Sequence, residues 1–352
     1  MAALDFVFEE NVDAARSLAA DRFFLNSFHK PGRAHPGVLR VYGTRGDFVS
    51  IGRYHRTAGR STTPPIWRRL SGGRALPFGR GFVGVSLVLP HRSALVSEEP
   101  FALAPYQVPN RYVRGILKAL RALGIDAFYP GRDFITVNRR VIGMVTFETD
   151  EKGGLVFDAI LALDRDFGIL PGLLSTADPG GYLQGEILAP HAVTSVNAEL
   201  EEDIEAGALA DAVRRGFAEQ FRIEVTAREL SPLETRAIAA IESREFTDGW
   251  VSCRPVRKDL PLFAATPTSL GVFEVCFALA QDRFLREVQL SGDFIANAAS
   301  VEALERELRL CPADWRSIAL VADQVFNRPE NYILGIGKLR TIPDTIVKAL
   351  PQ

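Results

Sequence analysis

The chain has 352 residues, of which 47% are hydrophobic and 24% charged, and its formal net charge is −2 at pH 7. These values are typical of a globular protein and exclude both a disordered chain and a polycation that binds nucleic acid. The N-terminus is acidic where a signal peptide is basic, and no apolar run approaches the roughly 20 residues of a membrane span. We therefore expect a cytoplasmic protein with no membrane or nucleic-acid partner.

The first part of the chain alternates short strands with helices. A helix capped by Asn11 presents one apolar face as far as Phe23, and two short strands follow at 37–42 and 47–52, with a turn near Gly46. Residues 82–90 are apolar at every position, which is typical of a strand covered on both faces. The following elements are a helix over 113–123, strands over 133–137, 140–147 and 155–163, a Pro- and Gly-rich loop from 171 to 192, and a helix over 209–221.

The remainder predicts a second, smaller unit. Ser231 and Glu234 form a capping box with Pro232 at the first helical position, so a helix begins there. Prolines over 250–268 indicate a linker, strands flank Gln281, and a helix follows Ser300. Strands and helices are mixed and neighbouring strands form hairpins, which predicts an α+β fold with a mixed sheet flanked by helices. We expect a large domain over 1–228, a helix and linker over 229–268, and a small α+β domain over 269–352.

Residues 68–81, "RRLSGGRALPFGRG", combine four arginines with four glycines. Glycine lets a backbone approach a ligand closely, and its free N–H groups then hold anions. Arginine binds phosphate or carboxylate with two hydrogen bonds. The stretch matches neither a Walker A loop nor a dinucleotide-binding fingerprint, so taken alone it is better explained as a turn carrying solvated arginines.

The same stretch carries a resemblance to a known family. "RRLSGG" (68–73) resembles the R-R-x-S/T-G-G-G signature of lipoate–protein ligases, whose catalytic fold is shared with biotin ligases and octanoyltransferases. Upstream, "SIGR" ending at Arg53 resembles the family's S-I-G-R, and downstream "GRDFITVNRRVIG" (131–143) resembles G-R-N-D-L-V-V-x-G-R-K-I-A-G. "VTSV" (193–196) and "VQLSGDF" (288–294) resemble segments of the catalytic and accessory domains, so the resemblance covers most of the chain.

The resemblance implies a reaction. Such enzymes condense lipoate or octanoate with ATP and Mg²⁺ to an acyl-adenylate, and a lysine of a lipoyl-acceptor domain then attacks it. The acceptor is implied to belong to a 2-oxoacid dehydrogenase or a glycine-cleavage protein, and the ligase to be a monomer without a metal site of its own. Arg140 stands at the position of the family's catalytic lysine. The implied binding positions are Arg53, Arg69, Ser71, Gly72, Gly73, Arg74, Ala75, Asp133, Gly143 and Asp158.

Four departures separate this chain from the family pattern. Arg74 replaces the third glycine, and the following residues lose the family's His-Asp pair and its Asn. Arg140 replaces a compact point charge with a larger planar one, and a misplacement of roughly 1 Å can cost about a hundredfold in rate. Asp158 stands in the strand where the family has His-His-Gly-Thr-Leu. We expect Asp158 to pair with Arg140 across the strands.

Three functions remain open: a ligase that tolerates Arg140, a transferase of the same fold, and a binding protein that keeps the pocket without the chemistry. A transferase with a cysteine nucleophile is disfavoured, because no cysteine precedes Cys253. Cys253, Cys276 and Cys311 lie far apart without a C-x-x-C pair, so we expect buried thiols rather than disulfides or a zinc site. The five histidines form no H-x-x-x-H pair, which disfavours a metal site.

Overall fold

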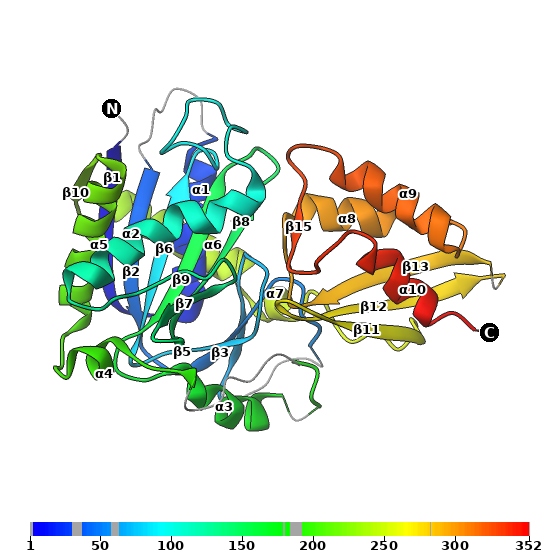
Figure 1. Cartoon of the computed structure of the whole chain (residues 1–352), viewed down its shortest axis with the longest axis horizontal. Helices are drawn as coiled ribbons and strands as arrows, with labels where there is room; N and C mark the ends of the chain where they lie inside the picture. Colours follow the sequence, from blue (N-terminus) through cyan, green and yellow to red (C-terminus); the bar gives the residue numbers. More distant parts are fainter. Residues whose placement is uncertain are drawn as a thin grey trace.

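The protein folds into two lobes, described here from a computed structural model (Figure 1). The structure describes residues 3–29, 37–57, 63–178, 180–183, 192–281 and 283–351. We call the part up to residue 251 the N-terminal lobe and the part from residue 262 onward the C-terminal lobe. Part of the loop predicted around residues 58–65 lies outside the described residues.

A mixed seven-stranded sheet forms the centre of the N-terminal lobe. Its strand order is β10-β1-β2-β6-β9-β8-β7, with β1 parallel to both β10 and β2 and every other neighbouring pair antiparallel. The bounds are β1 Ala3–Val12, β2 Gly37–Thr44, β6 Phe82–Leu89, β7 Phe134–Val137, β8 Arg140–Thr149, β9 Leu155–Ala162 and β10 Glu224–Ala227. This arrangement confirms the predicted α+β fold with a mixed sheet. Strand β1 was missed by the sequence analysis.

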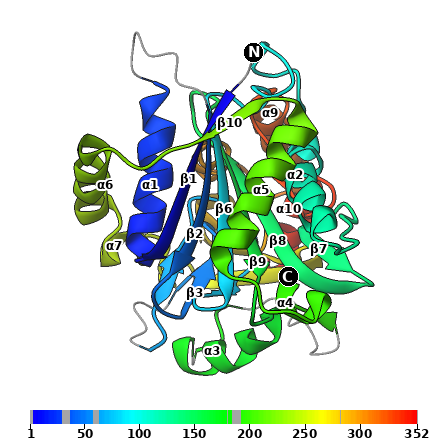
Figure 2. The same cartoon turned by 90° about the vertical axis from the view of Figure 1, so that its left-hand side faces the viewer.

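Helices cover both faces of this sheet (Figure 2). α2 (Val108–Ala122) and α5 (Ala206–Phe221) pack on one face, while α1 (Ala14–Ser27) packs on the other and α6 (Pro232–Glu245) packs against the outer side of α1. Strand β6 therefore buries all eight of its residues, as its continuous apolar sequence predicts. The capping box that begins α6 is confirmed, whereas α1 begins after Asp13 rather than Asn11.

The β7–β8 turn is also as predicted. Asn138 and Arg139 both have positive φ, at 48° and 68°, which a two-residue turn of the hairpin-closing type requires.

The predicted loop from 171 to 192 is partly wrong, because it contains most of α3 (Leu170–Ala177). Residues 179 and 184–191 of that loop lie outside the described part. The remaining short helices of the N-terminal lobe are η1 Pro105–Gln107, η2 Phe167–Ile169, α4 Val196–Leu200 and α7 Asp248–Val251.

A small second sheet holds the glycine- and arginine-rich stretch. β3 (Phe48–Ile51) lies between β4 (Ile66–Arg68), which is parallel to it, and β5 (Leu76–Phe78), which is antiparallel. The predicted neighbours β2 and β3 therefore belong to different sheets. The segment between β4 and β5 becomes a loop over 69–75 with both ends anchored, and we call it the glycine-rich loop.

The C-terminal lobe is a three-stranded antiparallel sheet covered by helices. Its strands are β11 Leu262–Thr268, β12 Gly271–Ala280 and β13 Phe284–Gly292, with a small pair β14 Ile295–Ala296 and β15 Ile333–Leu334, and its helices are α8 Ala298–Glu307, α9 Trp315–Phe326 and α10 Thr341–Lys348. The segment predicted as a linker contains α7 and β11, and β11 pairs with β12 along its whole length. Helices α9 and α10 were not predicted.

The segment after β3 joins the two lobes. The ring of Tyr54 stacks on Phe294 with 4.5 Å between ring centroids, and its hydroxyl donates to the carbonyl of Ala296 at 2.6 Å. His55 Nε2 lies 2.9 Å from a carboxylate oxygen of Asp293, and both side chains are buried. These contacts fix the C-terminal lobe against the edge of the glycine-rich loop.

The structure also tests the expectations for the three cysteines and for membrane-spanning helices. Cys276 and Cys311 are buried free thiols, as predicted, but Cys253 is exposed because it follows the end of α7 at the surface. Within the described ranges, the structure contains no helix that is both long enough and apolar enough to span a bilayer.

Candidate active site

The guanidinium group of Arg69 holds the glycine-rich loop in shape. Its Nη1 donates to the Ser50 carbonyl at 2.7 Å, and its Nη2 donates to the carbonyls of Gly72 and Arg74 at 3.0 and 2.8 Å. Burial lowers the pKa of Arg69 to about 10, so it remains protonated at neutral pH. Arg69 therefore positions the loop backbone.

The neighbouring arginine is also committed to the backbone. Arg68 is fully buried and donates to the carbonyls of Gly52, Arg53, His55 and Val251 at 2.7–3.3 Å. Two of the four arginines in the stretch thus satisfy carbonyl groups of their own fold. The interpretation of the stretch as a row of free anion-binding side chains is wrong for this pair.

Gly72 and Gly73 allow the C-terminal lobe to approach the loop. The Gly73 N–H donates to the Phe294 carbonyl at 2.8 Å, and Gly73 has a φ of +89°. A Cβ on Gly72 would lie 2.1 Å from that same carbonyl oxygen. At Gly72 the need for glycine thus comes from contact between the lobes, and at Gly73 it comes from the positive φ, whereas the sequence alone attributed both to a ligand.

We expect Gly72→Ala to lower the free energy of unfolding by about 1–3 kcal/mol, because backbone atoms of two lobes must separate to admit the methyl group. Gly43→Ala is the matched control, since no atom lies within 4 Å of its would-be Cβ. Urea denaturation of both variants measures the difference. Equal stability of the two variants would show that the contact with Phe294 is dispensable.

Arg74 and Asp133, both predicted site residues, pair with each other. Arg74 Nε lies 2.5 Å from a carboxylate oxygen of Asp133, and the guanidinium stacks over the ring of Phe134 at 4.6 Å. Both charged side chains are buried. Arg74 therefore lies beside the glycine-rich loop, where its positive charge is paired with the carboxylate of Asp133.

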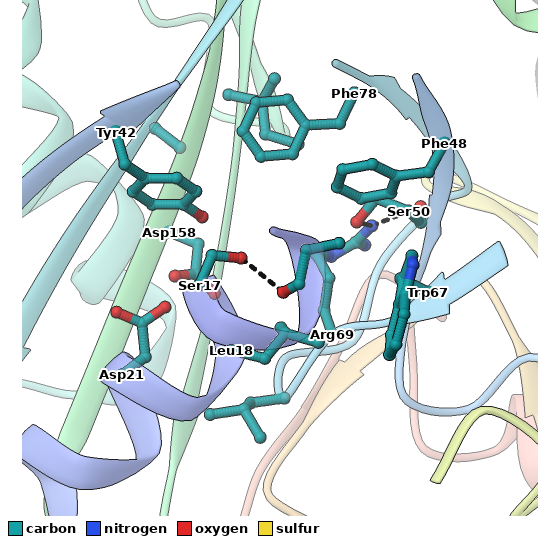
Figure 3. Close-up of a pocket in the computed structure, with 14 residues that line it drawn as sticks. Ser17, Leu18, Asp21, Tyr42, Phe48, Ser50, Trp67, Arg69, Phe78 and Asp158 are labelled. Atoms are coloured by element: carbon teal, nitrogen blue, oxygen red, sulfur yellow. Dashed lines mark hydrogen bonds between the residues drawn. The ribbon is translucent and has the colours of Figure 1, made fainter. Parts of the chain in front are cut away.

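A small cavity lies between α1, the two sheets and the glycine-rich loop (Figure 3). We call it the first cavity; its volume is about 30 Å³. Aromatic side chains form much of its wall, and they are Tyr42, Phe48, Trp67 and Phe78. Of the predicted site residues, Arg69 and Asp158 line it. The volume matches about one water molecule, so any larger guest must displace wall side chains.

Asp158 is the polar group at the centre of this wall. It accepts a hydrogen bond from the Ser71 hydroxyl at 2.9 Å, which brings two predicted site residues together. Burial raises the pKa of Asp158 to about 7, and the nearby charge of Asp21 adds to the rise, although the hydrogen bond from Ser71 opposes it. The carboxyl group therefore changes its charge near neutral pH.

A buried ion cluster beneath the cavity was missed by the sequence analysis. Arg40 has no exposed side-chain surface, and it donates from Nε to Glu9 at 2.7 Å and from Nη1 to Asp21 at 3.2 Å. Its guanidinium also lies 4.3 Å from the ring centroid of Tyr42. The available signal was a single arginine inside the apolar stretch "GVLRVYGT", which required a buried counter-ion.

Arg140 lies at the start of β8, outside the first cavity. Its Nη2 is 2.6 Å from a carboxylate oxygen of Glu199, and its side chain is 43% exposed. The predicted Arg140–Asp158 pair is wrong, because Asp158 is paired with Thr146 across β8 and β9. Thr146 is six positions along β8 from Arg140, a distance of roughly 20 Å.

The other predicted site residues lie around the loop. Gly143 sits in β8 opposite Leu161, and Ala75 is buried next to β5. Arg53 lines a second cavity, between the lobes. The described residues contain no group of three His, Cys, Asp or Glu side chains that could hold a metal ion, and His35 and His191 lie outside them.

Comparison with known proteins identifies the fold. No protein-family model and no curated protein sequence matches the chain. Among solved structures, P. falciparum LipL1 in complex with lipoate matches 98% of this chain and 99% of its own, with a TM-score of 0.69 and 12% identity. Lipoate-protein ligase A bound with ATP matches 72% of this chain and 99% of its own, with a TM-score of 0.56 and 18% identity.

A bipartite lipoate protein ligase from Thermoplasma acidophilum, solved in a study with its E2 lipoyl domain, matches 73% of this chain and 98% of its own. Its TM-score is 0.58 at 19% identity. The chain thus has the catalytic fold of lipoate–protein ligases, as its resemblance predicted. The LipL1 match extends through the C-terminal lobe.

Proposed function

We propose that the protein is a lipoate–protein ligase-like enzyme that activates lipoate or octanoate with ATP and transfers the acyl group to a lysine. The observation that supports this most is the first cavity, an aromatic-walled space closed by the glycine-rich loop in the fold of lipoate ligases. The acceptor is a lipoyl domain of a 2-oxoacid dehydrogenase or a glycine-cleavage protein. We also propose that the enzyme acts as a cytoplasmic monomer.

The acyl chain enters the first cavity by displacing wall side chains, and its carboxyl group lies at the loop near Ser71. The buried charge of Arg69, in the wall of the first cavity, stabilises the negative charge that develops there. In the transfer step the lysine amine forms a C–N bond to the acyl carbon, the C–O bond to phosphate breaks, and AMP leaves. The proton of the amine passes to solvent.

Magnesium enters this scheme with the nucleotide. Because Mg²⁺ in such sites is bound by phosphates, waters and one or two carboxylates, a preformed protein cage is unnecessary. The described residues contain no three-ligand cluster that would form such a cage, so the phosphates would be the main ligands of the metal.

The proposal predicts a mass change. An apo lipoyl domain incubated with this protein, lipoate, ATP and Mg²⁺ should gain one lipoyl group, detected by intact mass spectrometry and absent without ATP. Ser71→Ala should slow the reaction roughly tenfold, because it removes one hydrogen-bond donor from the loop. Arg309→Ala, at an exposed surface position, is the control. No mass gain while an established ligase modifies the same domain would refute the ligase.

A binding protein without catalysis is the second candidate, supported by the pairing of Arg140 with Glu199. In the ligase, Arg140 must leave Glu199 and supply the charge of the family's lysine, so Arg140→Ala abolishes transfer while Arg140→Lys retains it. In the binding protein, lipoate binds to the wild type and to Arg140→Ala with equal affinity, and neither modifies the acceptor. Intact mass spectrometry of the acceptor separates the two candidates, and calorimetry shows whether lipoate binds.

A further inference from the structure

A second cavity lies between the lobes, at the C-terminal half of α1. Its volume is about 250 Å³, and α1, the segment after β3, the end of β8 and the start of α8 contribute to its wall. Leu70 separates it from the first cavity, because this side chain lines both. The second cavity is therefore a neighbouring but distinct space, and it is lined by ionisable side chains where the first is lined by rings.

Two arginines face the second cavity, and among the described residues neither has a hydrogen-bonded carboxylate. Arg22 has its nearest carboxylate, Glu245, at 3.7 Å, and its Nε is buried with no hydrogen-bond partner among the described residues. Arg53 has its nearest carboxylate, Glu302, at 3.8 Å, and its guanidinium lies 5.3 Å from the Trp250 ring. Burial lowers the pKa of Arg22, and the like charge of Arg53 lowers it further. The free protein thus holds two positive charges together.

Glu148 supplies a third polar group at the same wall. It is 5% exposed, and its Oε1 accepts a hydrogen bond from the Ala298 N–H, at the N-terminus of α8, at 2.8 Å. Its Oε2 is buried without a hydrogen-bond partner among the described residues. Burial raises the pKa of Glu148 to about 8, against the opposing charge of Arg53, so near pH 7 the carboxyl is mostly protonated and can donate a hydrogen bond.

Acidic side chains also line this cavity, and they are hydrogen-bonded to a neighbour or exposed to water. Asp150 lies 2.5 Å from His29, Glu302 is 62% exposed, and Glu151 is exposed beside Lys152. Charges in contact with water are screened far more strongly than buried ones. Arg22 and Arg53 therefore face the second cavity with only long ion pairs, at 3.7 Å to Glu245 and 3.8 Å to Glu302.

We propose that the second cavity binds a phosphate group. A tetrahedral oxyanion can accept hydrogen bonds from both guanidinium groups and from protonated Glu148, and the positive end of α8 adds to the attraction. The cavity is larger than a carboxylate needs, which favours phosphate and leaves room for part of a larger molecule. This site is separate from the first cavity, where the proposed function places the acyl chain, although Arg53 is also one of the binding positions that the resemblance implies.

Calorimetry on the full chain at pH 6.5 and low chloride tests the proposal, with inorganic phosphate, pyrophosphate and AMP as probes. We expect at least one probe to bind with 1:1 stoichiometry, and Arg22→Gln and Arg53→Gln each to weaken that binding at least tenfold. Arg309→Gln, 59% exposed in its side chain, should leave it unchanged. If phosphate binds most tightly, the site takes the free ion. If pyrophosphate does, the site takes the by-product of adenylation, and if AMP does, it takes a nucleotide.

Two outcomes would overturn the site: no binding of any probe at 10 mM, or equal affinity in the wild type and both arginine variants. Circular dichroism of each variant shows whether a loss of binding is caused by a loss of folded structure. Because the second cavity is tested with variants that leave Ser71 and Asp158 intact, failure of this site is distinguishable from failure of the ligase.

The pH dependence gives a second readout, using sulfate because its charge is constant over the range. Sulfate affinity should fall as pH rises through about 8, since ionised Glu148 repels the anion. Glu148→Gln should bind equally well at pH 6.5 and 9. The ionisable groups that act on Glu148 are Arg22 of α1, Arg53 and Tyr54 after β3, Asp150 after β8, and Tyr332 before β15. A fall in affinity that persists in Glu148→Gln would contradict the assigned role of this carboxyl.

Discussion

Replacing Arg40 with methionine should lower the free energy of unfolding by about 3–5 kcal/mol, the range for breaking a buried ion pair from one side. Arg40 has no exposed side-chain surface, and it donates to both Glu9 and Asp21, while Arg16 makes a longer bond of 3.4 Å to Glu9. Its loss leaves two carboxylates under the first cavity, where burial already raises the pKa of Asp21. Methionine fills much of the volume, so the change reports mainly on charge.

Urea denaturation at pH 7.5 measures this effect, and two further variants separate its causes. Arg40→Lys keeps the charge and should lose less than Arg40→Met. Adding Asp21→Asn to Arg40→Met should restore part of the loss, because one stranded carboxylate disappears. Arg306→Met removes an exposed ion pair with Glu307 and should cost less than about 1 kcal/mol. A loss in Arg40→Met no larger than that in Arg306→Met would contradict the buried cluster.

Local features of the fold were predictable from the sequence because neighbouring residues determine them. The turn at Asn138 needs residues that tolerate positive φ, and the α6 capping box needs only Ser231 and Glu234. The apolar run of β6 likewise predicted a strand covered on both faces. In each case the physical cause lies within a few residues of the effect.

The candidate site was less predictable because its contacts join distant segments. The resemblance selected Ser71 and Asp158, which the structure brings within hydrogen-bond distance. It gave no indication that Arg74 would neutralise Asp133, or that the Phe294 backbone would occupy the N–H of Gly73. Spacing along the chain does not encode these partners, since each depends on how the two sheets and the two lobes pack.

Asp158→Asn should change how stability depends on pH. Asp158 has a pKa of about 7 in the folded protein against 3.8 for an ordinary aspartate, so between these values the folded state keeps a proton that the unfolded state has released. Stability of the wild type therefore falls as pH rises from about 4 to 7 and then becomes level with respect to this group. The shift corresponds to an upper bound of about 4 kcal/mol, at about 1.4 kcal/mol per pKa unit.

Asparagine cannot ionise, so the free energy of unfolding of the variant should lack the fall with pH that Asp158 causes in the wild type. Relative to the wild type, Asp158→Asn should gain stability steadily from pH 4.5 to 7.5, as measured by urea denaturation at each pH. Glu148→Gln is the comparison, because the pKa of Glu148 is raised to about 8 and its gain should continue to higher pH. Parallel pH profiles for the wild type and Asp158→Asn would show that Asp158 is already ionised in the folded protein.

The same titration should appear in activity if the protein is the proposed ligase. Above pH 7 ionised Asp158 places a negative charge beside Ser71, where the carboxylate of the acyl substrate must lie. Adenylate formation from lipoate should therefore decline in the wild type as pH rises through about 7, and Asp158→Asn should flatten the decline. Pyrophosphate release at pH 6 and 8 measures this. An equally steep decline in the variant would assign the pH dependence to another group and leave Asp158 a structural partner of Ser71.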